Sequence, residues 1–427
     1  MPNRAERRAA KKQGIALPAT RPEKVPHRVA RGVTPMRVTW ASNSPFAPTG
    51  YGVQTAQVVE RLQADGHEVA VACNFGLQGS ETEWNGIKLY PTGVTPYSDD
   101  ILSAHAQHWA SGSDLPSVVI TLFDVWALKN PSIARIPRIA AWVPIDHKPA
   151  PPEVTEWLRR DNVLPIAMSH FGSEMMEVDK IEHLYAPHAF DGRVFKPTPS
   201  FKDAAGNTIR GREIMGVEDE FAFVVMMNSA NKGRTPPRKS WGENLLAFGV
   251  FAQDKPDAIL YLHTDESAAL GGVDLRLLVK ACGIREEQVR FVNQYLYRMN
   301  MPQTALASLY TDADVLLATS AGEGFGVPVI EAQACGTPVI VSNWTAQPEL
   351  VGDGWIVDGQ PLWDAFQNSW FFTPNVGNIV RALEEAYQRP RGIVSEDATR
   401  FAAAYEADRV YAEYWRPIME TLARWEP

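Results

Sequence analysis

Two glutamates on either side of a proline give this sequence its clearest chemical signal. Glu323 and Glu331 flank Pro328. Proline suits the first turn of a helix, and Gly336 suits the left-handed residue that follows a helix end. The sequence therefore predicts that Glu323 lies in a loop and Glu331 in the second turn of the next helix. Carboxylates accept hydrogen bonds from paired hydroxyls, so the two glutamates indicate a ligand that carries sugar hydroxyls.

The loop between the two glutamates predicts an anion site. Gly324 and Gly326 allow the backbone to approach a ligand closely. The unpaired N–H groups and the dipole at the N-terminus of the following helix favour negative charge. We expect Gly324, Phe325, Gly326 and Val327 to contact this anion. An anion held between two hydroxyl acceptors fits a ligand whose phosphates join two sugars, and a nucleotide sugar is such a ligand.

Alternating strands and helices must position these residues. Short apolar runs that read as buried strands recur through the first half of the chain: Met36–Ala41, His67–Asn74, Ser117–Phe123, Arg138–Pro144 and Val163–Ser169. The pattern breaks at the proline-containing stretch Pro187–Gly211 and restarts at Phe221–Asn228. Such alternation predicts two doubly wound α/β domains with parallel sheets. Ligands bind beyond the carboxyl ends of such strands, so the residues after each strand are the candidates for chemistry.

Composition and charge narrow the class of protein. The 427 residues carry a net charge of −9, no apolar run long enough to span a membrane, and only three cysteines. We therefore expect a cytoplasmic protein with no transmembrane segment. Nine basic and two acidic residues give residues 1–31 a charge of +7, which leaves −16 on the rest. An acidic body disfavours a broad nucleic-acid surface, although the basic leader could contact an anion.

The segment EGFGVPVIEAQACGTPVIVS, which begins at Glu323, resembles the signature of retaining glycosyltransferases of the GT-B fold, in the large group 1 (family 4-like) class. Two other segments resemble the same class. They are Pro48-Thr-Gly-Tyr-Gly52 and Ala186-Pro-His-Ala-Phe-Asp, in which Ala189 stands where a glycine is usual. The resemblance implies a GT-B fold, in which two Rossmann-like domains face each other across a cleft. The leader also resembles the starts of bacteriophage proteins.

The resemblance implies a division of the chain into five parts. These are a basic leader (1–34), an acceptor domain (35–196), a linker (197–215), a nucleotide-sugar domain (216–395) and a helix that crosses back to the first domain (396–427). A basic pair after the first strand of the second domain would bind the donor diphosphate. We expect Arg238 and Lys239 in this role, with Arg234 as the substitute and Asn228 at the strand end.

The resemblance also implies the remaining site residues. The turn with Gln294 and Tyr295 would hold the base of the donor. A polar residue of the acceptor domain would lie near the anomeric carbon, and we expect Asp146 or His147 there, with Asp124 as the alternative. The Gly50, Tyr51 and Gly52 loop would face the diphosphate. Glu323 is the expected catalytic residue of the second domain, and Glu331 is expected to bind donor.

The resemblance implies sugar transfer from a nucleoside diphosphate sugar with retention, and with a basic pair and a helix N-terminus at the diphosphate we expect no metal or other cofactor. The base stays open among uracil, guanine and adenine, with UDP or GDP as the expected nucleotide, and so does the choice between a front-face and a double-displacement mechanism. The acceptor is unidentified, with a protein side chain or a modified DNA base as the predicted classes. Two alternatives remain. One is a nucleotide-sugar epimerase or hydrolase, and the other is a non-catalytic binding or scaffold protein.

Overall fold

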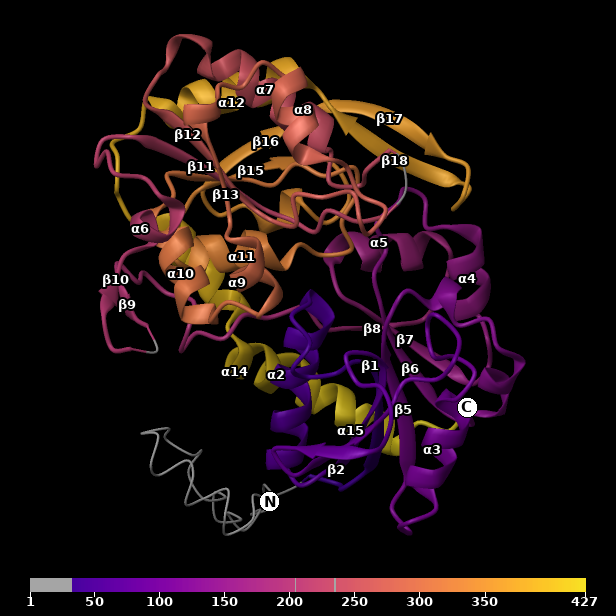
Figure 1. Ribbon diagram of the computed structural model, residues 1–427. Coiled ribbons are helices and arrows are strands. Elements are labelled where there is room, and N and C mark those ends of the chain that lie inside the picture. The colour runs from indigo at the N-terminus through magenta and orange to yellow at the C-terminus, as the bar shows by residue number, and fades with distance from the viewer. Residues whose placement is uncertain (1–32, 204, 234–235) are drawn as a thin grey trace.

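The computed structural model describes residues 33–427 except 204 and 234–235. Two α/β domains are stacked, with the C-terminal domain above the N-terminal one in Figure 1. The two doubly wound parallel sheets predicted from the sequence are both present. The basic leader and Arg234 lie outside the described residues. No helix among the described residues is long and apolar enough to span a membrane.

The N-terminal sheet has the order β3-β4-β2-β1-β5-β6-β7-β8 and is parallel except at β3–β4. Its strands are β1 (Arg37–Asn43), β2 (Glu68–Phe75), β3 (Thr82–Trp84), β4 (Ile87–Tyr90), β5 (Ser117–Leu122), β6 (Ile139–Val143), β7 (Val163–Ala167) and β8 (Leu184–Tyr185). The helices of this domain are α2 (Gly50–Ala64), α3 (Leu102–Ala110), α4 (Pro152–Leu158) and α5 (His170–Val178). The strand order reverses between β1 and β5, which makes this junction the switch point where open α/β sheets bind ligands.

The C-terminal sheet is fully parallel, in the order β13-β12-β11-β14-β15-β16. Its strands are β11 (Phe223–Asn228), β12 (Ala258–His263), β13 (Val289–Phe291), β14 (Val315–Leu317), β15 (Val339–Ser342) and β16 (Gly354–Val357). The helices are α6 (Gly211–Met215), α7 (Trp241–Phe251), α8 (Leu275–Ala281), α9 (Gln294–Arg298), α10 (Gln303–Asp312), α11 (Val327–Ala334) and α12 (Val376–Tyr387). Its switch point lies between β11 and β14.

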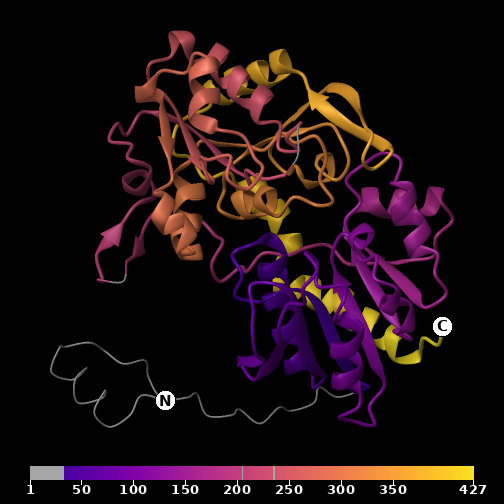
Figure 2. The same ribbon diagram turned by 45° about the vertical axis from the view of Figure 1, so that its right-hand side comes forward.

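Two hairpins interrupt this regular alternation. The expected linker contains a short antiparallel pair, β9 (Phe201–Lys202) and β10 (Thr208–Ile209). A longer antiparallel pair, β17 (Gly359–Asp364) and β18 (Ser369–Pro374), projects from the C-terminal domain toward α4 and α5 (Figures 1 and 2). Its backbone meets the N-terminal domain, because the Lys148 N–H donates to the Trp370 carbonyl at 3.2 Å. The strand pattern of the sequence does not predict this second hairpin.

The chain end crosses back to the N-terminal domain, but as a broken helix and not as the single one expected from Glu396 to Trp425 (Figure 1). It comprises α13 (Glu396–Ala402), a 3-10 turn (Ala403–Tyr405), α14 (Ala407–Val410), a π-helical turn (Tyr411–Trp415) and α15 (Arg416–Arg424). The first break has a clear cause. The Tyr405 carbonyl and the Ala407 N–H both pair with the backbone of Phe190, which a continuous helix would forbid.

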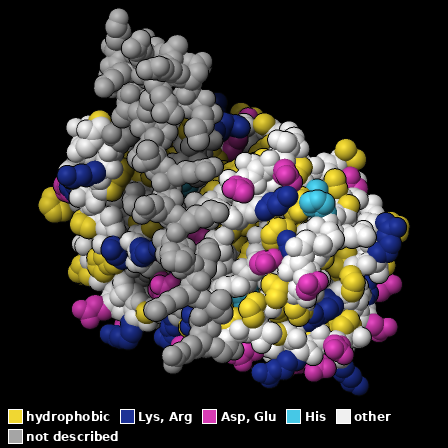
Figure 3. All heavy atoms as spheres, turned by 90° about the horizontal axis from the view of Figure 1, so that it is seen from below, with side chains coloured by type: hydrophobic (Ala, Val, Ile, Leu, Met, Phe, Trp, Pro, Cys, Tyr) yellow, Lys and Arg dark blue, Asp and Glu magenta, His cyan; other side chains and the backbone are white. Residues whose placement is uncertain are grey.

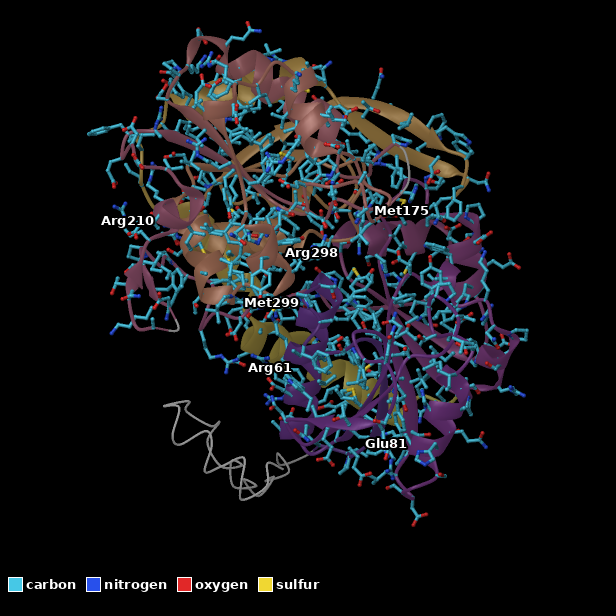
Figure 4. The ribbon with its side chains drawn as sticks, in the orientation of Figure 1. Arg61, Glu81, Met175, Arg210, Arg298 and Met299 are labelled. Carbon is cyan, nitrogen blue, oxygen red and sulfur yellow. The ribbon has the colours of Figure 1, made fainter. Side chains whose placement is uncertain are left out.

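Ion pairs and aromatic packing fix this crossing segment. Arg61 of α2, labelled in Figure 4, pairs with Asp408 at 2.7 Å, and Arg416 pairs with Asp65 at 2.7 Å. Burial of Trp415, which is 1% exposed, contributes more to the stability of this contact than the ion pairs do. Its ring centroid lies 5.6 Å from that of Trp40 and 4.9 Å from that of Trp142. Trp415 thus completes the core of the N-terminal domain from the far end of the chain.

Charge on the molecular surface is mixed where it can be seen. In the view from below, acidic and basic side chains alternate with apolar ones outside the area that grey atoms cover (Figure 3). Neither sign forms a continuous patch on that visible part.

Truncation of Trp415 tests the crossing segment. We expect Trp415→Ala to lower the free energy of unfolding of the N-terminal domain by about 3–5 kcal/mol, the usual cost of removing a buried tryptophan. Trp363→Ala is the matched control because that side chain is 48% exposed, and it should cost less than about 1 kcal/mol. Denaturant unfolding followed by circular dichroism measures both. Equal losses in the two variants would contradict this role of Trp415.

Candidate active site

Glu323 and Glu331 occupy the loop and the helix that the sequence predicts for them. Glu323 follows β14, and Glu331 lies in α11, which has Pro328 in its first turn. Gly326 precedes the helix with φ +126°, a backbone conformation that side chains disfavour. Gly336 follows the helix with φ +86°, as expected for a left-handed C-terminal residue.

Glu323 is the centre of a cluster of charged side chains. Its Oε2 accepts a 2.8 Å hydrogen bond from Nη1 of Arg238, and its Oε1 accepts hydrogen bonds from Nζ of Lys239 and, at 2.8 Å, from Oγ of Ser320. Burial alone would raise the pKa of Glu323, but the two cations and the hydrogen bonds lower it to about 2. The predicted basic pair and the predicted loop carboxylate therefore meet at the switch point between β11 and β14.

Glu331 has the opposite electrostatic environment. Its carboxylate is buried, and burial raises its pKa to about 8 although the Tyr310 hydroxyl donates to Oε2 at 3.2 Å. Tyr310 in turn accepts a 2.6 Å hydrogen bond from Nδ2 of Asn228, at the end of β11. This chain of hydrogen bonds orients the Glu331 carboxyl group. The sequence does not mark Tyr310 as a site residue, because a buried aromatic residue in a helix is usually part of the core.

The N-terminal domain closes directly on this loop. A Cβ atom on Gly322 would lie 2.0 Å from the Asp146 carbonyl oxygen, and one on Gly324 would lie 2.4 Å from Cβ of Pro144. These two glycines thus allow the domains to touch. The Asp146 carboxylate lies 3.9 Å from Nη1 of Arg238, so an acidic group from the first domain faces the cluster of the second.

His147 is enclosed behind Asp146 and does not face the space beside Glu323. Its Nδ1 lies 2.7 Å from Oδ1 of Asp146, and its Nε2 lies 3.1 Å from Oδ2 of Asp364 in the β17–β18 hairpin. The Phe371 ring stacks on the imidazole at 3.7 Å, which leaves the side chain 2% exposed. In this structure His147 contacts Asp146, Asp364 and Phe371, and its expected place beside the anomeric carbon stays a prediction.

The glycine loop after β1 meets the end of β5 at the switch point of the N-terminal sheet. The Thr49 side chain caps α2 by accepting a 3.0 Å hydrogen bond from the Gly52 N–H, while Gly50 begins the helix. The Tyr51 hydroxyl donates to Oδ2 of Asp124 at 3.3 Å. Burial and the nearby Asp146 raise the pKa of Asp124 to about 6. Asp124, the alternative in the sequence analysis, therefore belongs electrostatically to the same cluster.

The residues predicted to hold the donor base lie on the turn after β13. Gln294 Nε2 donates to the carbonyls of Thr264 and Val292, at 3.1 and 2.9 Å, and joins the turns that follow β12 and β13. Tyr295 is largely exposed on α9. Arg298 of the same helix projects from the C-terminal domain near its border with the N-terminal one (Figure 4).

Residues 275–402 match the family model described as Glycosyl transferases group 1. This segment of the chain is similar to the group 1 glycosyltransferases. It includes both Glu323 and Glu331, so the loop and helix described above fall within the matched segment. The match ends with α13, the first helix of the crossing segment, and does not reach the N-terminal domain.

Curated proteins that resemble this chain match it over parts of their length. It is 28% identical over 189 residues to the D-inositol 3-phosphate glycosyltransferase of Paenarthrobacter aurescens (strain TC1), which is 44% of this chain and 40% of the relative. It is 40% identical over 75 residues to O-antigen chain mannosyltransferase B of Escherichia coli, which is 18% of each. The chain thus spans less than half the length of these relatives.

Solved structures resemble the chain over both domains. Sucrose-phosphate synthase (tll1590) from Thermosynechococcus elongatus has a TM-score of 0.66 at 16% identity, over 91% of this chain and 98% of that one. An E. coli structure titled as trehalose-6-phosphate bound with UDP-2-fluoro glucose has a TM-score of 0.62 at 11% identity, over 91% and 99%. The glycosyltransferase WaaG has a TM-score of 0.57 at 14% identity, over 90% and 98%. The chain has the GT-B fold, with two Rossmann-like domains.

The two glutamates should affect stability with opposite dependence on pH. Glutamate titrates near pH 4.5 in the absence of these environments. Glu331 keeps its proton in the folded protein up to about pH 8, so its contribution to stability is lost as the pH rises from about 4.5 to about 8. Glu323 stays ionised down to about pH 2, so its contribution is lost as the pH falls from about 4.5 to about 2.

We therefore expect Glu331→Gln to raise the free energy of unfolding of the unliganded protein at pH 9 by about 1–4 kcal/mol, because a neutral amide replaces a buried carboxylate. The gain should shrink toward zero at pH 5.5. Glu323→Gln should lower the free energy of unfolding by about 1–3 kcal/mol at both pH values, because it removes the counter-ion of Arg238 and Lys239. Denaturant titrations at the two pH values measure these effects. Changes in the free energy of unfolding with the same sign for both variants at pH 9 would contradict the opposite pKa shifts of the two glutamates.

Proposed function

We propose that this protein transfers a sugar from a nucleoside diphosphate sugar to a hydroxyl acceptor, with retention at the anomeric carbon and without a metal ion. The observation that carries this proposal is the cluster in which Glu323 is shared by Arg238 and Lys239, beside the N-terminus of α11. Two cations and a helix N-terminus form a site for a diphosphate. The neighbour whose title names UDP-2-fluoro glucose supports the same class of ligand.

In this proposal the donor replaces the internal contacts of the cluster. The diphosphate oxygens take the place of the Glu323 carboxylate on Arg238 and Lys239, and the first N–H groups of α11 bind the same anion. Glu331, oriented by Tyr310, accepts hydrogen bonds from the ribose hydroxyls once it is ionised. The turn at Gln294 receives the base, which stays open among uracil, guanine and adenine.

The proposed chemistry breaks the bond between the anomeric carbon and the diphosphate oxygen. Negative charge grows on the diphosphate as the sugar becomes oxocarbenium-like, and the fixed cations stabilise that charge. The acceptor oxygen bonds to the anomeric carbon, and its proton passes to the departing diphosphate. Asp146, which His147 holds in place, faces the developing positive charge on the sugar.

The cationic pair gives the most direct test of donor binding. We expect Arg238→Ala and Lys239→Ala each to weaken binding of UDP or GDP by about tenfold or more, with little change for uridine or guanosine, because hydrogen bonds to a charged phosphate are worth about 1.5–3 kcal/mol. Calorimetry with the four ligands measures this difference. Arg389→Ala is the matched control, because Arg389 pairs with Asp353 in another part of the domain.

Transfer itself is tested by incubation of labelled UDP-glucose or GDP-mannose with candidate acceptors and with water alone. Label on an acceptor, in the presence of EDTA, supports metal-independent transfer. Release of free sugar without any transfer would favour the hydrolase alternative. Equal loss of nucleoside and nucleoside diphosphate binding in the two variants would contradict the diphosphate site.

A further inference from the structure

We propose that the acceptor is a neutral saccharide whose ring binds on an aromatic platform formed by Tyr97 and Trp126, beside Asp124, with the buried Phe123 ring packed against Tyr97. This inference rests on the proposed function and names the substrate class of its acceptor side. It replaces the protein side chain or modified base suggested by the basic leader, which lies outside the described residues.

The platform connects the charged cluster with the β17–β18 hairpin. The Phe123 ring centroid lies 6.3 Å from that of Tyr51 and 5.8 Å from that of Tyr97. Tyr97 lies 5.9 Å from Trp126, which lies 5.5 Å from Phe366 in the hairpin turn. These rings form a continuous row that starts at the partner of Asp124 and ends at the hairpin. An acceptor on this row would thus lie next to the cluster that would hold the donor.

The loop that carries Tyr97 is held rigidly. Asp99 Oδ2 accepts hydrogen bonds from the N–H groups of Lys129 and Asn130, at 3.0 and 2.8 Å, and thereby joins this loop to the segment after Trp126. Asp100 accepts from the N–H groups of Val94 and Thr95, at 3.0 and 3.3 Å. The backbone that carries Tyr97 is therefore held in place before a ligand binds, which lowers the entropic cost of binding.

A small recess that Tyr97 helps to line contains polar side chains. It is lined by Tyr97, Phe123, Thr121 and Asn74, among other residues, at the carboxyl ends of β1, β2 and β5. Within the described part of the chain, Oγ1 of Thr121 and Oδ1 of Asn74 are buried and have no hydrogen-bond partner. A buried oxygen without a partner costs free energy. A hydroxyl group that entered the recess would supply the missing hydrogen bonds.

The chemistry of this surface favours a neutral sugar over a lipid phosphate or a sugar phosphate. A sugar ring has an apolar face of C–H groups and an edge of hydroxyls. The aromatic rings can pack against the apolar face of the sugar. The Asp124 carboxylate and the two oxygens of the recess can accept hydrogen bonds from its hydroxyls. A phosphate placed here would meet Asp124 and Asp146. The cations that act electrostatically on Asp124, Arg238 and Lys232, come from the donor side.

The hairpin completes the platform from the other domain. Its inner face docks on the first domain through Asp364 and Phe371, which contact His147. Trp363 lies on the opposite face, because side chains alternate along a strand, and it packs against Trp370 at 5.0 Å. The acceptor side of the site is therefore formed fully only when the hairpin is docked.

The test compares acceptors in the full-length protein. The probes are maltose and methyl α-mannoside as neutral saccharides, glucose 6-phosphate and inositol 1-phosphate as phosphorylated ones, and farnesyl phosphate as a soluble lipid phosphate. With labelled UDP-glucose or GDP-mannose, we expect transfer to a neutral saccharide and a lower KM for it than for the phosphorylated compounds. A preference for a sugar phosphate or for farnesyl phosphate would overturn the proposal.

Two variants test the platform itself. Trp126→Ala should raise the acceptor KM about tenfold, and Tyr97→Ala, which alters a side chain already 40% exposed, should do the same if the first variant folds poorly. The Kd for UDP or GDP should stay within twofold in both. Trp363→Ala, on the outer face of the hairpin, is the control and should leave the acceptor KM unchanged.

Different outcomes distinguish failure of the proposed function from failure of the acceptor proposal. If the protein binds no nucleoside diphosphate, the proposed function fails. If it binds donor and transfers sugar to a phosphorylated acceptor but none to a neutral saccharide, only the acceptor inference fails. Equal effects of Trp126→Ala and Trp363→Ala on the acceptor KM would also overturn it.

Discussion

The ion pairs of Glu323 with Arg238 and Lys239 are the interaction on which the rest of the site depends. They join the loop after β11 to the loop after β14, across the switch point of the C-terminal sheet. All three groups are partly shielded from water, so removal of one partner leaves uncompensated charge. A dianionic ligand could replace the carboxylate at little cost, because it would supply the charge that the two cations require. The unliganded cluster is in this sense arranged as the proposed function requires.

The two domains provide different groups at equivalent places. In the N-terminal sheet the hydrogen bond from Tyr51 to Asp124 spans the switch point between β1 and β5, just as the Glu323 ion pairs span the one between β11 and β14. Glycines at 322 and 324 permit the backbones of the two domains to touch. Side chains there would hold the domains apart and separate Asp146 from Arg238. The close approach therefore depends on residues that contribute no functional group of their own.

Local patterns were sufficient to predict the parts of the site that are local. The spacing of Glu323, Pro328 and Glu331 predicts a loop followed by a helix, and the structure has both. The strand pattern predicts two parallel sheets, and the candidates that follow β11 and β14 meet as expected. These features depend on nearby residues and on the general rule for open sheets.

Long-range contacts account for what the sequence did not reveal. Asp364 contacts His147 from a distant part of the chain, and nothing local marks either residue as a partner. In the sequence, Tyr310 cannot be distinguished from other buried aromatic residues, and only the structure shows its hydroxyl bonded to Glu331. The break in the C-terminal helix follows from backbone pairing with Phe190, which helix propensity does not encode. Each of these features depends on tertiary packing that overrides local preference.

The most direct test of this account is a crystal structure of the protein with UDP or GDP. The account predicts the diphosphate on Arg238 and Lys239 at the N-terminus of α11, with Glu323 released from at least one of the two cations and Glu331 bonded to the ribose hydroxyls. A nucleotide bound away from these residues, with the Glu323 ion pairs intact, would contradict it.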